Sequence, residues 1–170
     1  MPYEPIPKRY APDAIHLIRT AQQMQLQLSA MADQKASILM GAAFVVFSIT
    51  ISQAAQQNAS PAMLVLAGFA LVAAVLAVLA IIPAVTPPEG APLNLLFFGS
   101  FTALDQDDYI ERLVALVGDE EQVYRTMARD IYQNGAVLAR KKYRYLAYAY
   151  RVFLLGLVVT VAVFAGTHLR

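Results

Sequence analysis

Residues 31–50, MADQKASILMGAAFVVFSIT, place Asp33 and Lys35 directly before a run of apolar side chains. Between Lys35 and Glu89 the chain carries no ionisable side chain. That length is enough for two membrane spans of about 20 residues each and a tight connection between them. The stretch therefore predicts a helical hairpin in a membrane, with two charged residues at its entrance.

The composition of the whole chain agrees with this interpretation. Of 170 residues, 58% are hydrophobic and only 15% are charged, and the mean hydropathy of +0.50 lies outside the usual range of soluble domains. A third apolar run, 152–167, lies between Arg151 and His168. We expect an all-α membrane protein with spans at about 36–52, 61–85 and 152–167, long helical cytoplasmic extensions and one short helix. Cysteine is absent, which excludes disulfides and thiolate metal sites.

The basic residues predict how these spans are oriented. Four of them precede the first span, eight lie between the second and third, and only Arg170 follows the third, so twelve of the 13 fall on one side. The positive-inside rule makes that side cytoplasmic. Residues 1–35 and 86–151 are then cytoplasmic, and 152–170 form the third span and a short outer tail. A cleavable signal ending near Ser52 is disfavoured, because the charged lead before it is too long.

Prolines prevent a helix in the first residues, and Asp13 is a plausible N-cap for one that continues into the first span. Apolar residues along this helix follow the 4-3 alternation of packed helices, with Lys35 in the same series. The series consists of Leu17, Ala21, Met24, Leu28, Met31, Lys35 and Ile38.

The second cytoplasmic region opens with the turn TPPEGAP, followed by a short strand or an aromatic loop near 94–101. Capping-box spacings, Asp108 with Glu111 and Asp119 with Gln122, predict a short helix at about 106–117 and a long helix from near Glu120 into the third span. The long helix carries a second 4-3 series: Tyr124, Ala128, Ile131, Gly135, Leu138, Lys142, Tyr145, Ala149, Val152 and Gly156.

Lys35 and Lys142 are cations on helix faces that otherwise pack, which suggests an anion in the interior. Snorkelling from the end of a span is the simpler explanation for Lys35, as attraction to lipid headgroups is for the cluster around Lys142. Arginine and lysine also recognise phosphate. The tyrosines nearby suit an interfacial aromatic belt or a surface on which a base stacks. The cluster comprises Arg140, Lys141, Lys142 and Arg144, and the tyrosines are Tyr143, Tyr145, Tyr148 and Tyr150.

No pattern of an enzyme is present in the sequence. The acidic groups suit helix starts, and His16 and His168 fall on opposite sides of the membrane, so they cannot share a metal or act as a catalytic pair. We therefore expect no catalytic residues, no metal site and no cofactor. Small residues at close-packing spacing, such as Ser37 with Gly41, and spans of 16 or 17 residues favour association of several copies.

The arrangement resembles the small transmembrane effectors of the Pycsar antiphage systems. The resemblance rests on ADQKASIL, on FFGSF followed by DDYIERL, and on IYQNGAVLARKKYRYL, and it covers about residues 15–165. It implies a bacterial inner-membrane protein that responds to a cyclic pyrimidine nucleotide, cCMP or cUMP, and then impairs the membrane and kills the infected cell. A partner cyclase makes the nucleotide without necessary contact, and no nucleic acid is bound. The residues carried over are Asp33, Lys35, Ser37, Lys142 and Tyr143.

The resulting hypothesis assigns the ligand to the cytoplasmic helices. Lys35, Lys142 and Arg140 neutralise the single charge of the phosphodiester where helices of one or more copies meet, and a tyrosine, Tyr143 or Tyr145, covers the base. Asp33 holds a lysine in position when the site is empty, or accepts a hydrogen bond from the base. Two alternatives remain: a constitutive membrane scaffold that docks another protein without a nucleotide, and a ligand-gated ion channel.

Overall fold

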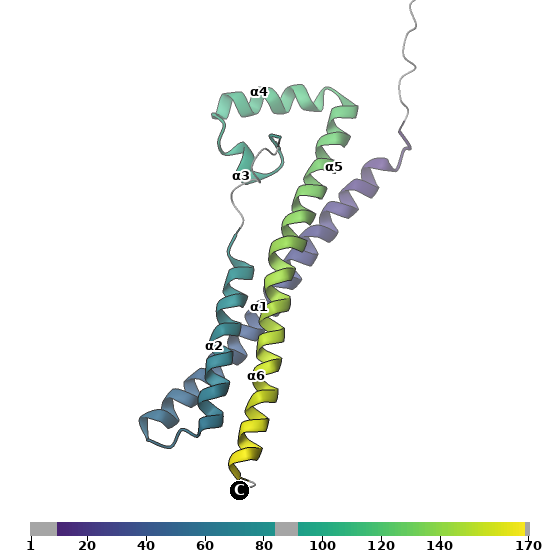
Figure 1. Ribbon diagram of the computed structural model, residues 1–170. Helices are drawn as coiled ribbons and strands as arrows, with labels where there is room; N and C mark the ends of the chain where they lie inside the picture. Colours follow the sequence, from purple (N-terminus) through teal and green to yellow (C-terminus); the bar gives the residue numbers. More distant parts are fainter. Residues whose placement is uncertain (1–9, 84–91, 169–170) are drawn as a thin grey trace, which may run out of the picture. The chain divides into compact units, whose positions relative to one another are not determined.

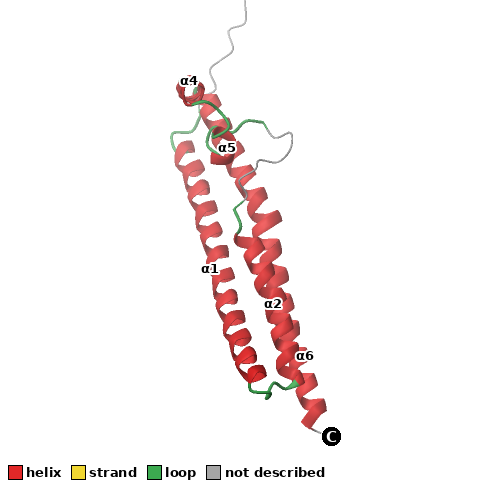
Figure 2. Cartoon of the chain, turned by 90° about the vertical axis from the view of Figure 1, so that its left-hand side faces the viewer, coloured by secondary structure: helices red, strands yellow, loops and turns green. Residues whose placement is uncertain are grey.

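The structure, a computed structural model, describes residues 10–83 and 92–168. Within these ranges every regular element is a helix and none is a strand (Figures 1 and 2). The expected all-α class is confirmed; of the two expectations for residues 94–101 the strand is wrong, and the loop is correct only for 94–97, because Phe98–Phe101 form a short helix. The helices are α1 (Ala14–Ala55), α2 (Pro61–Ile81), α3 (Phe98–Phe101), α4 (Gln106–Val117), α5 (Glu120–Val137), the π-helix η1 (Leu138–Tyr143) and α6 (Arg144–His168).

Three helical stretches are long and apolar enough to cross a membrane. They are Ala14–Ala55, Pro61–Ile81 and Glu120–Thr167, and each contains or nearly matches one predicted span. The second helix ends at Ile81, four residues earlier than predicted, and Pro83 follows shortly after it. The turn predicted at TPPEGAP lies almost entirely outside the described residues. By contacts the chain forms two units: unit 1 comprises Met1–Leu26 and Val85–Asn134, and unit 2 comprises Gln27–Ala84 and Gly135–Arg170.

Unit 2 is built around small side chains. Helices α2 and α6 lie side by side in both views (Figures 1 and 2), and every fully buried residue of α2 is an alanine. The tightest contact is at Gly156, which is buried on α6: a Cβ added there would lie 2.8 Å from Cγ of Phe69 on α2 and closer still to its Cβ. Glycine is therefore required at this crossing, because any side chain would push the two helices apart. The shared core consists of Ala32, Ala36, Leu39, Ala77, Ala80, Leu146 and Ala149.

The connection between α1 and α2 shows why the hairpin turns where it does. Gln57 has a φ of 57°, its N–H donates to the Ala54 carbonyl (3.0 Å), and the N–H of Asn58 donates to the Gln53 carbonyl (2.9 Å). This pattern is a Schellman motif, which ends α1. Ser60 then caps α2, because its Oγ accepts a hydrogen bond from the Met63 N–H at 3.3 Å. The short polar loop predicted between the first two spans is confirmed.

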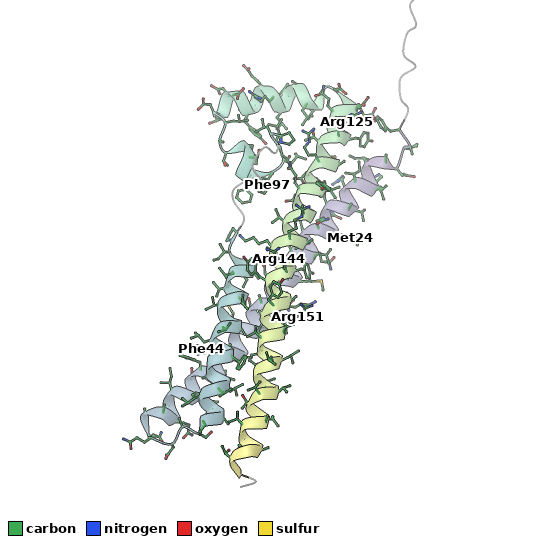
Figure 3. All side chains as sticks on the ribbon, in the orientation of Figure 1. Met24, Phe44, Phe97, Arg125, Arg144 and Arg151 are labelled. Carbon is green, nitrogen blue, oxygen red and sulfur yellow. The ribbon has the colours of Figure 1, made fainter. Side chains whose placement is uncertain are left out.

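The packed face of α1 differs from the predicted one. In the predicted series, Leu17, Met24, Leu28, Met31 and Ile38 are all exposed, and Met24 can be located in Figure 3. The buried residues of α1 are Ala32, Ala36, Leu39, Ala43 and Thr50, and the first four follow a 4-3 alternation one position further along the chain. The period was therefore predicted correctly, but for the contacts within the chain the phase was wrong.

The helix from Glu120 to the end of the third span is continuous, as predicted, but one part of it is not an α-helix. Residues Leu138–Tyr143 are wound as a π-helix between α5 and α6. The second predicted series is partly confirmed, since Leu138, Ala149 and Gly156 are buried. Segments of π-helix are rare and are often found at functional sites.

Unit 1 contains the aromatic loop, α3, α4 and α5. Helix α4 begins directly after Asp105, so the predicted start of the short helix is right, but Asp108 and Glu111 do not form its capping box. The Asp108 carboxylate instead accepts from Arg112 Nε at 2.8 Å. The other predicted box is present only in its N-cap half: Asp119 Oδ1 accepts from the Gln122 N–H at 3.1 Å. The Gln122 side chain does not accept from the Asp119 N–H, which donates to the Leu116 carbonyl, and Gln122 Nε2 instead donates to Asp119 Oδ2 at 2.9 Å.

Candidate functional site

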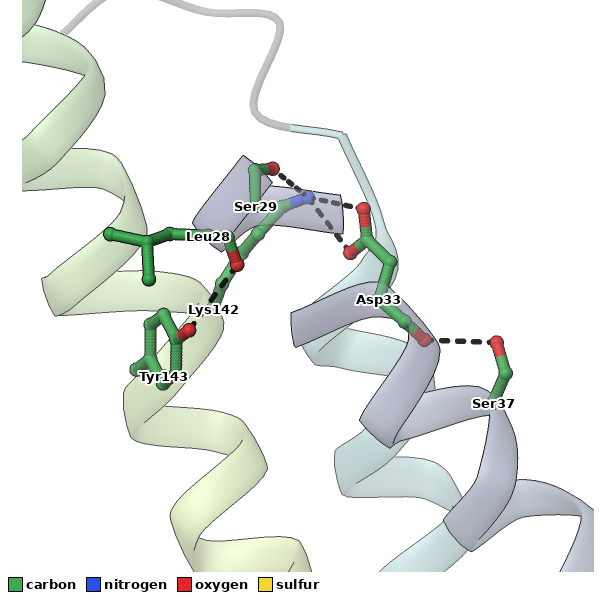
Figure 4. A network of polar contacts seen from close by, with 6 residues as sticks. All are labelled: Leu28, Ser29, Asp33, Ser37, Lys142 and Tyr143. Carbon is green, nitrogen blue, oxygen red and sulfur yellow. Dashed lines mark hydrogen bonds and ion pairs between the residues drawn. The ribbon is translucent and has the colours of Figure 1, made fainter. Parts of the chain in front are cut away.

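The ammonium of Lys142 is fully hydrogen-bonded within unit 2. It donates to Asp33 Oδ1 at 2.8 Å, to Asp33 Oδ2 at 2.7 Å and to Ser29 Oγ at 2.8 Å (Figure 4). The lysine side chain is only 16% exposed, whereas that of Asp33 is 40% exposed. Because an ammonium has three N–H donors, Lys142 is both neutralised by one carboxylate and saturated. Two of the residues predicted for the site, Asp33 and Lys142, are therefore in direct contact.

Tyrosine hydroxyls add further contacts between α1 and the η1–α6 stretch. Tyr143 donates to the Leu28 carbonyl at 3.2 Å (Figure 4), and Tyr150 donates to the Lys35 carbonyl at 3.1 Å. Both rings also pack against the small-residue core of unit 2. The tyrosines thus combine an apolar contact with a polar one, as expected where one end of a ring is buried and the other is wet.

A cleft of ≈ 370 Å³ opens beside these tyrosines. It is lined by Lys35, Tyr143, Leu146, Ala147 and Tyr150. Lys35 is exposed, and no ion pair or hydrogen bond engages its ammonium within the part of the chain that the structure describes. The cleft therefore offers an unpaired cation, two aromatic rings and an apolar floor.

The two lysines lie at opposite edges of the contact between α1 and the η1–α6 stretch. Asp33 and Lys35 are two residues apart, so their side chains point about 200° apart around the helix axis. Buried Ala32 and Ala36 lie on the face between them. Within one chain, the Asp33–Lys142 ion pair therefore lies at one edge of this contact, and Lys35 lies at the other edge, beside the cleft.

The remaining predicted residues are less engaged. Ser37 Oγ donates to the Asp33 carbonyl at 2.9 Å, within its own helix (Figure 4), and is exposed. Arg140 is exposed on η1. Tyr145 packs against the core, and its ring centroid lies 5.9 Å from Cζ of Arg144. Among the predicted set, only Asp33, Lys35, Lys142 and Tyr143 therefore form the candidate site within one chain.

Sequence reasoning missed a buried polar cluster in unit 1. Asp130 accepts from Asn94 Nδ2 and from Gln22 Nε2, each at 3.1 Å, and Asn94 Nδ2 also donates to Gln133 Oε1 at 2.8 Å. Asn94 is fixed further by its N–H, which donates to Ser100 Oγ at 3.1 Å, and by its Oδ1, which accepts from Leu96 N–H at 2.9 Å.

This cluster anchors the aromatic loop on α5 and satisfies every polar atom of the Asn94 side chain. One signal could have revealed it: Asn94 is the only polar residue in the apolar run LNLLFF. Among the described residues, no three His, Cys, Asp or Glu side chains are placed to hold a metal ion.

Comparison with known proteins identifies the family. A family model described as the Pycsar effector protein domain matches residues 16–167, which is almost the range over which the sequence resemblance was found. No curated protein and no solved structure gave a match to the chain. Three helices that can cross a membrane and a family match over nearly the whole chain lead to one conclusion: the protein belongs to the Pycsar effector family, whose members are membrane effectors in antiphage defence.

Proposed function

We propose that this protein is a nucleotide-triggered membrane effector, in which a cyclic pyrimidine nucleotide, cCMP or cUMP, binds the cleft beside Lys35. The observation that supports this best is the unpaired Lys35 ammonium next to a cleft lined by Tyr143 and Tyr150. Family membership supports a cyclic nucleotide signal from a cyclase and a membrane context. The cyclase need not contact the effector.

The chemistry of the cleft suits such a ligand. A cyclic phosphodiester carries one negative charge, which one ammonium can neutralise through charge-assisted hydrogen bonds. A base stacked on a tyrosine ring contributes about 1–3 kcal/mol of binding free energy, whichever base it is. The volume of ≈ 370 Å³ lies at the lower end of the range of about 300–1,000 Å³ typical of small-molecule sites.

Binding there would bias the spans, because the lining residues belong to two helices that continue into the membrane. Lys35 is on α1, and Leu146, Ala147 and Tyr150 are on α6. A ligand that touches both helices favours one distance between them over others. It alters the membrane only if it binds the disruptive arrangement more tightly than the resting one. In this proposal the Asp33–Lys142 pair holds the resting arrangement at the opposite edge, and Arg140 adds positive charge nearby.

The proposal places the protein in the bacterial inner membrane as a multi-pass homo-oligomer, with the N-terminus in the cytoplasm and the C-terminus in the periplasm. The distribution of basic residues supports this orientation. After nucleotide binding the oligomer impairs the integrity of the membrane and causes abortive infection.

Calorimetric titration of the purified protein with cCMP and cUMP tests the proposal, together with dye leakage from vesicles. Loss of one charge-assisted contact in Lys35→Ala should remove about 1.5–3 kcal/mol of binding free energy, which is at least tenfold in Kd. Lys141→Ala is the matched control, because Lys141 does not line the cleft. No heat with either nucleotide, or wild-type affinity in folded Lys35→Ala, would refute the cleft as the site.

A second candidate function is a constitutive scaffold that docks another protein and binds no nucleotide. The exposed apolar residues of α1 favour it, because exposed apolar surface outside a membrane usually marks an interaction site. The same titration separates the two functions, since a scaffold gives no heat with either nucleotide.

A further inference from the structure

One face of α1 carries a regular apolar series whose large side chains are left exposed by the part of the chain that the structure describes. The large apolar members of the 4-3 series are between 40% and 73% exposed, and Ala21 is half-buried, while the neighbouring series of buried residues makes the contacts within the chain. The exposed members are Leu17, Met24, Leu28, Met31 and Ile38.

Lipid does not account for this face over its whole length. Residues 17–31 precede the charged residues Asp33 and Lys35, and the uncharged run begins only at Ala36. Each large apolar side chain loses about 1.5–3 kcal/mol if it remains in water rather than being buried. A 4-3 alternation sustained from Leu17 to Ile38 is the spacing of knobs-into-holes packing between helices. Contact with the hydrocarbon core of a membrane requires no such period, because a span there is apolar all round.

The flanks of the series indicate what kind of helix packs against it. Charged residues at the flanking positions of a coiled coil usually select the partner, but here Thr20, Gln27 and Gln34 flank one side and none is ionisable. Two identical helices can therefore meet without placing like charges against each other on this side. Copies anchored in the same membrane by the same span also emerge in parallel and at the same level.

We propose that a second copy of this chain packs in parallel along the exposed face of α1, with Leu17, Met24 and Met31 of the two copies in contact. This interface does not depend on nucleotide binding. A further consequence rests on the proposed function: Lys35 belongs to the series, so the two Lys35 ammonium groups meet in the seam between Met31 and Ile38. Like charges there repel, and a bound phosphodiester would offset the repulsion.

The absence of cysteine from the chain permits a clean test. Single-cysteine variants of the full chain are oxidised in native membranes and the dimer is measured on non-reducing gels. A disulfide needs Cβ atoms about 3.5–4.5 Å apart, so Met24→Cys and Met31→Cys should form dimers readily. Leu26→Cys is the matched control: Leu26 is 72% exposed and apolar, but it lies on the opposite side of α1 and should give only background dimer.

The result that overturns the interface is equal cross-linking at Met24→Cys and Leu26→Cys, or none at either, which would leave the face to lipid headgroups or to another protein. Cross-linking is measured without nucleotide, so it does not depend on the ligand. If the seam cross-links but neither cCMP nor cUMP binds, the interface stands and the nucleotide proposal fails. If nucleotide binds but the seam does not cross-link, the nucleotide proposal stands and the interface proposal fails.

Discussion

The ion pair between Asp33 and Lys142 should be a measurable source of stability in unit 2. Removing the carboxylate in Asp33→Ala leaves a largely buried ammonium that, among the described residues, keeps Ser29 as its one remaining acceptor. Breaking a fully buried pair costs about 3–5 kcal/mol, and an exposed pair is worth about 0–1 kcal/mol. Because Lys142 is 16% exposed and Asp33 is 40% exposed, we expect an intermediate loss of about 2 kcal/mol.

The loss can be measured by thermal unfolding of the detergent-solubilised protein. For a chain of this size 1 kcal/mol corresponds to about 2–4 °C in Tm, so Asp33→Ala should lower Tm by about 4–8 °C. The matched control is Asp108→Ala, which removes the exposed Asp108–Arg112 pair, in which the Asp108 side chain is 43% and the Arg112 side chain 52% exposed. That change should cost no more than about 0.5 kcal/mol.

A double-mutant cycle separates the interaction energy of the ion pair from the cost of leaving one buried charge without its partner. Lys142→Met removes the cation, and in the double variant with Asp33→Ala neither charge is left unpaired. The double variant should therefore be more stable than the sum of the two single changes predicts. Strictly additive effects, or an Asp33→Ala variant as stable as Asp108→Ala, would refute the claim that the two groups are coupled.

Two further predictions follow from other contacts. Gly156→Ala should lower the free energy of unfolding by about 1–3 kcal/mol, because the added methyl group overpacks against Phe69. At Gly68 an added Cβ meets nothing within 4 Å, so Gly68→Ala should leave Tm unchanged or higher. Equal Tm values for the two variants would contradict this. Hydrogen bonds from the Gln122 side chain and then from its backbone N–H lower the pKa of Asp119 below its ordinary value of 3.8. The cap is therefore fully present above that value and is lost as pH falls through the lower folded pKa. Asp119→Asn keeps a capping oxygen without titrating, so Tm profiles between pH 7 and pH 3 should diverge at the acid end; superimposable profiles would disprove the role of the charge.

Local signals in the sequence predicted the helices well. The start of α2 follows from Ser60 and Pro61, which are a cap and a first-turn residue, and α4 was expected at about 106–117 and found at Gln106–Val117. Such signals act within a few residues, so no knowledge of the tertiary structure is needed to read them. The Asp119 cap was found for the same reason.

The features that the sequence did not predict depend on contacts between distant residues. No characteristic residue composition marks Leu138–Tyr143 as a π-helix. The π-helical segment coincides with the contacts that Lys142 and Tyr143 make to α1. The phase of the packed face on α1 was missed because two 4-3 series run along the same helix, and only the position of the other helices decides which is buried. The pairing of Asn94 with Asp130 joins residues 36 positions apart.

The alanine interior of α2 reverses the usual response of a protein core to mutation. Cores built from large residues fail when side chains are truncated, because holes are left behind. The buried positions of α2 are all alanine, so truncating one of them removes only a methyl group and leaves almost no cavity. They are Ala62, Ala67, Ala70, Ala73, Ala77 and Ala80. A saturation mutagenesis screen should therefore show a periodic intolerance of bulk along this helix, with glycine and serine accepted at the very positions where leucine is rejected.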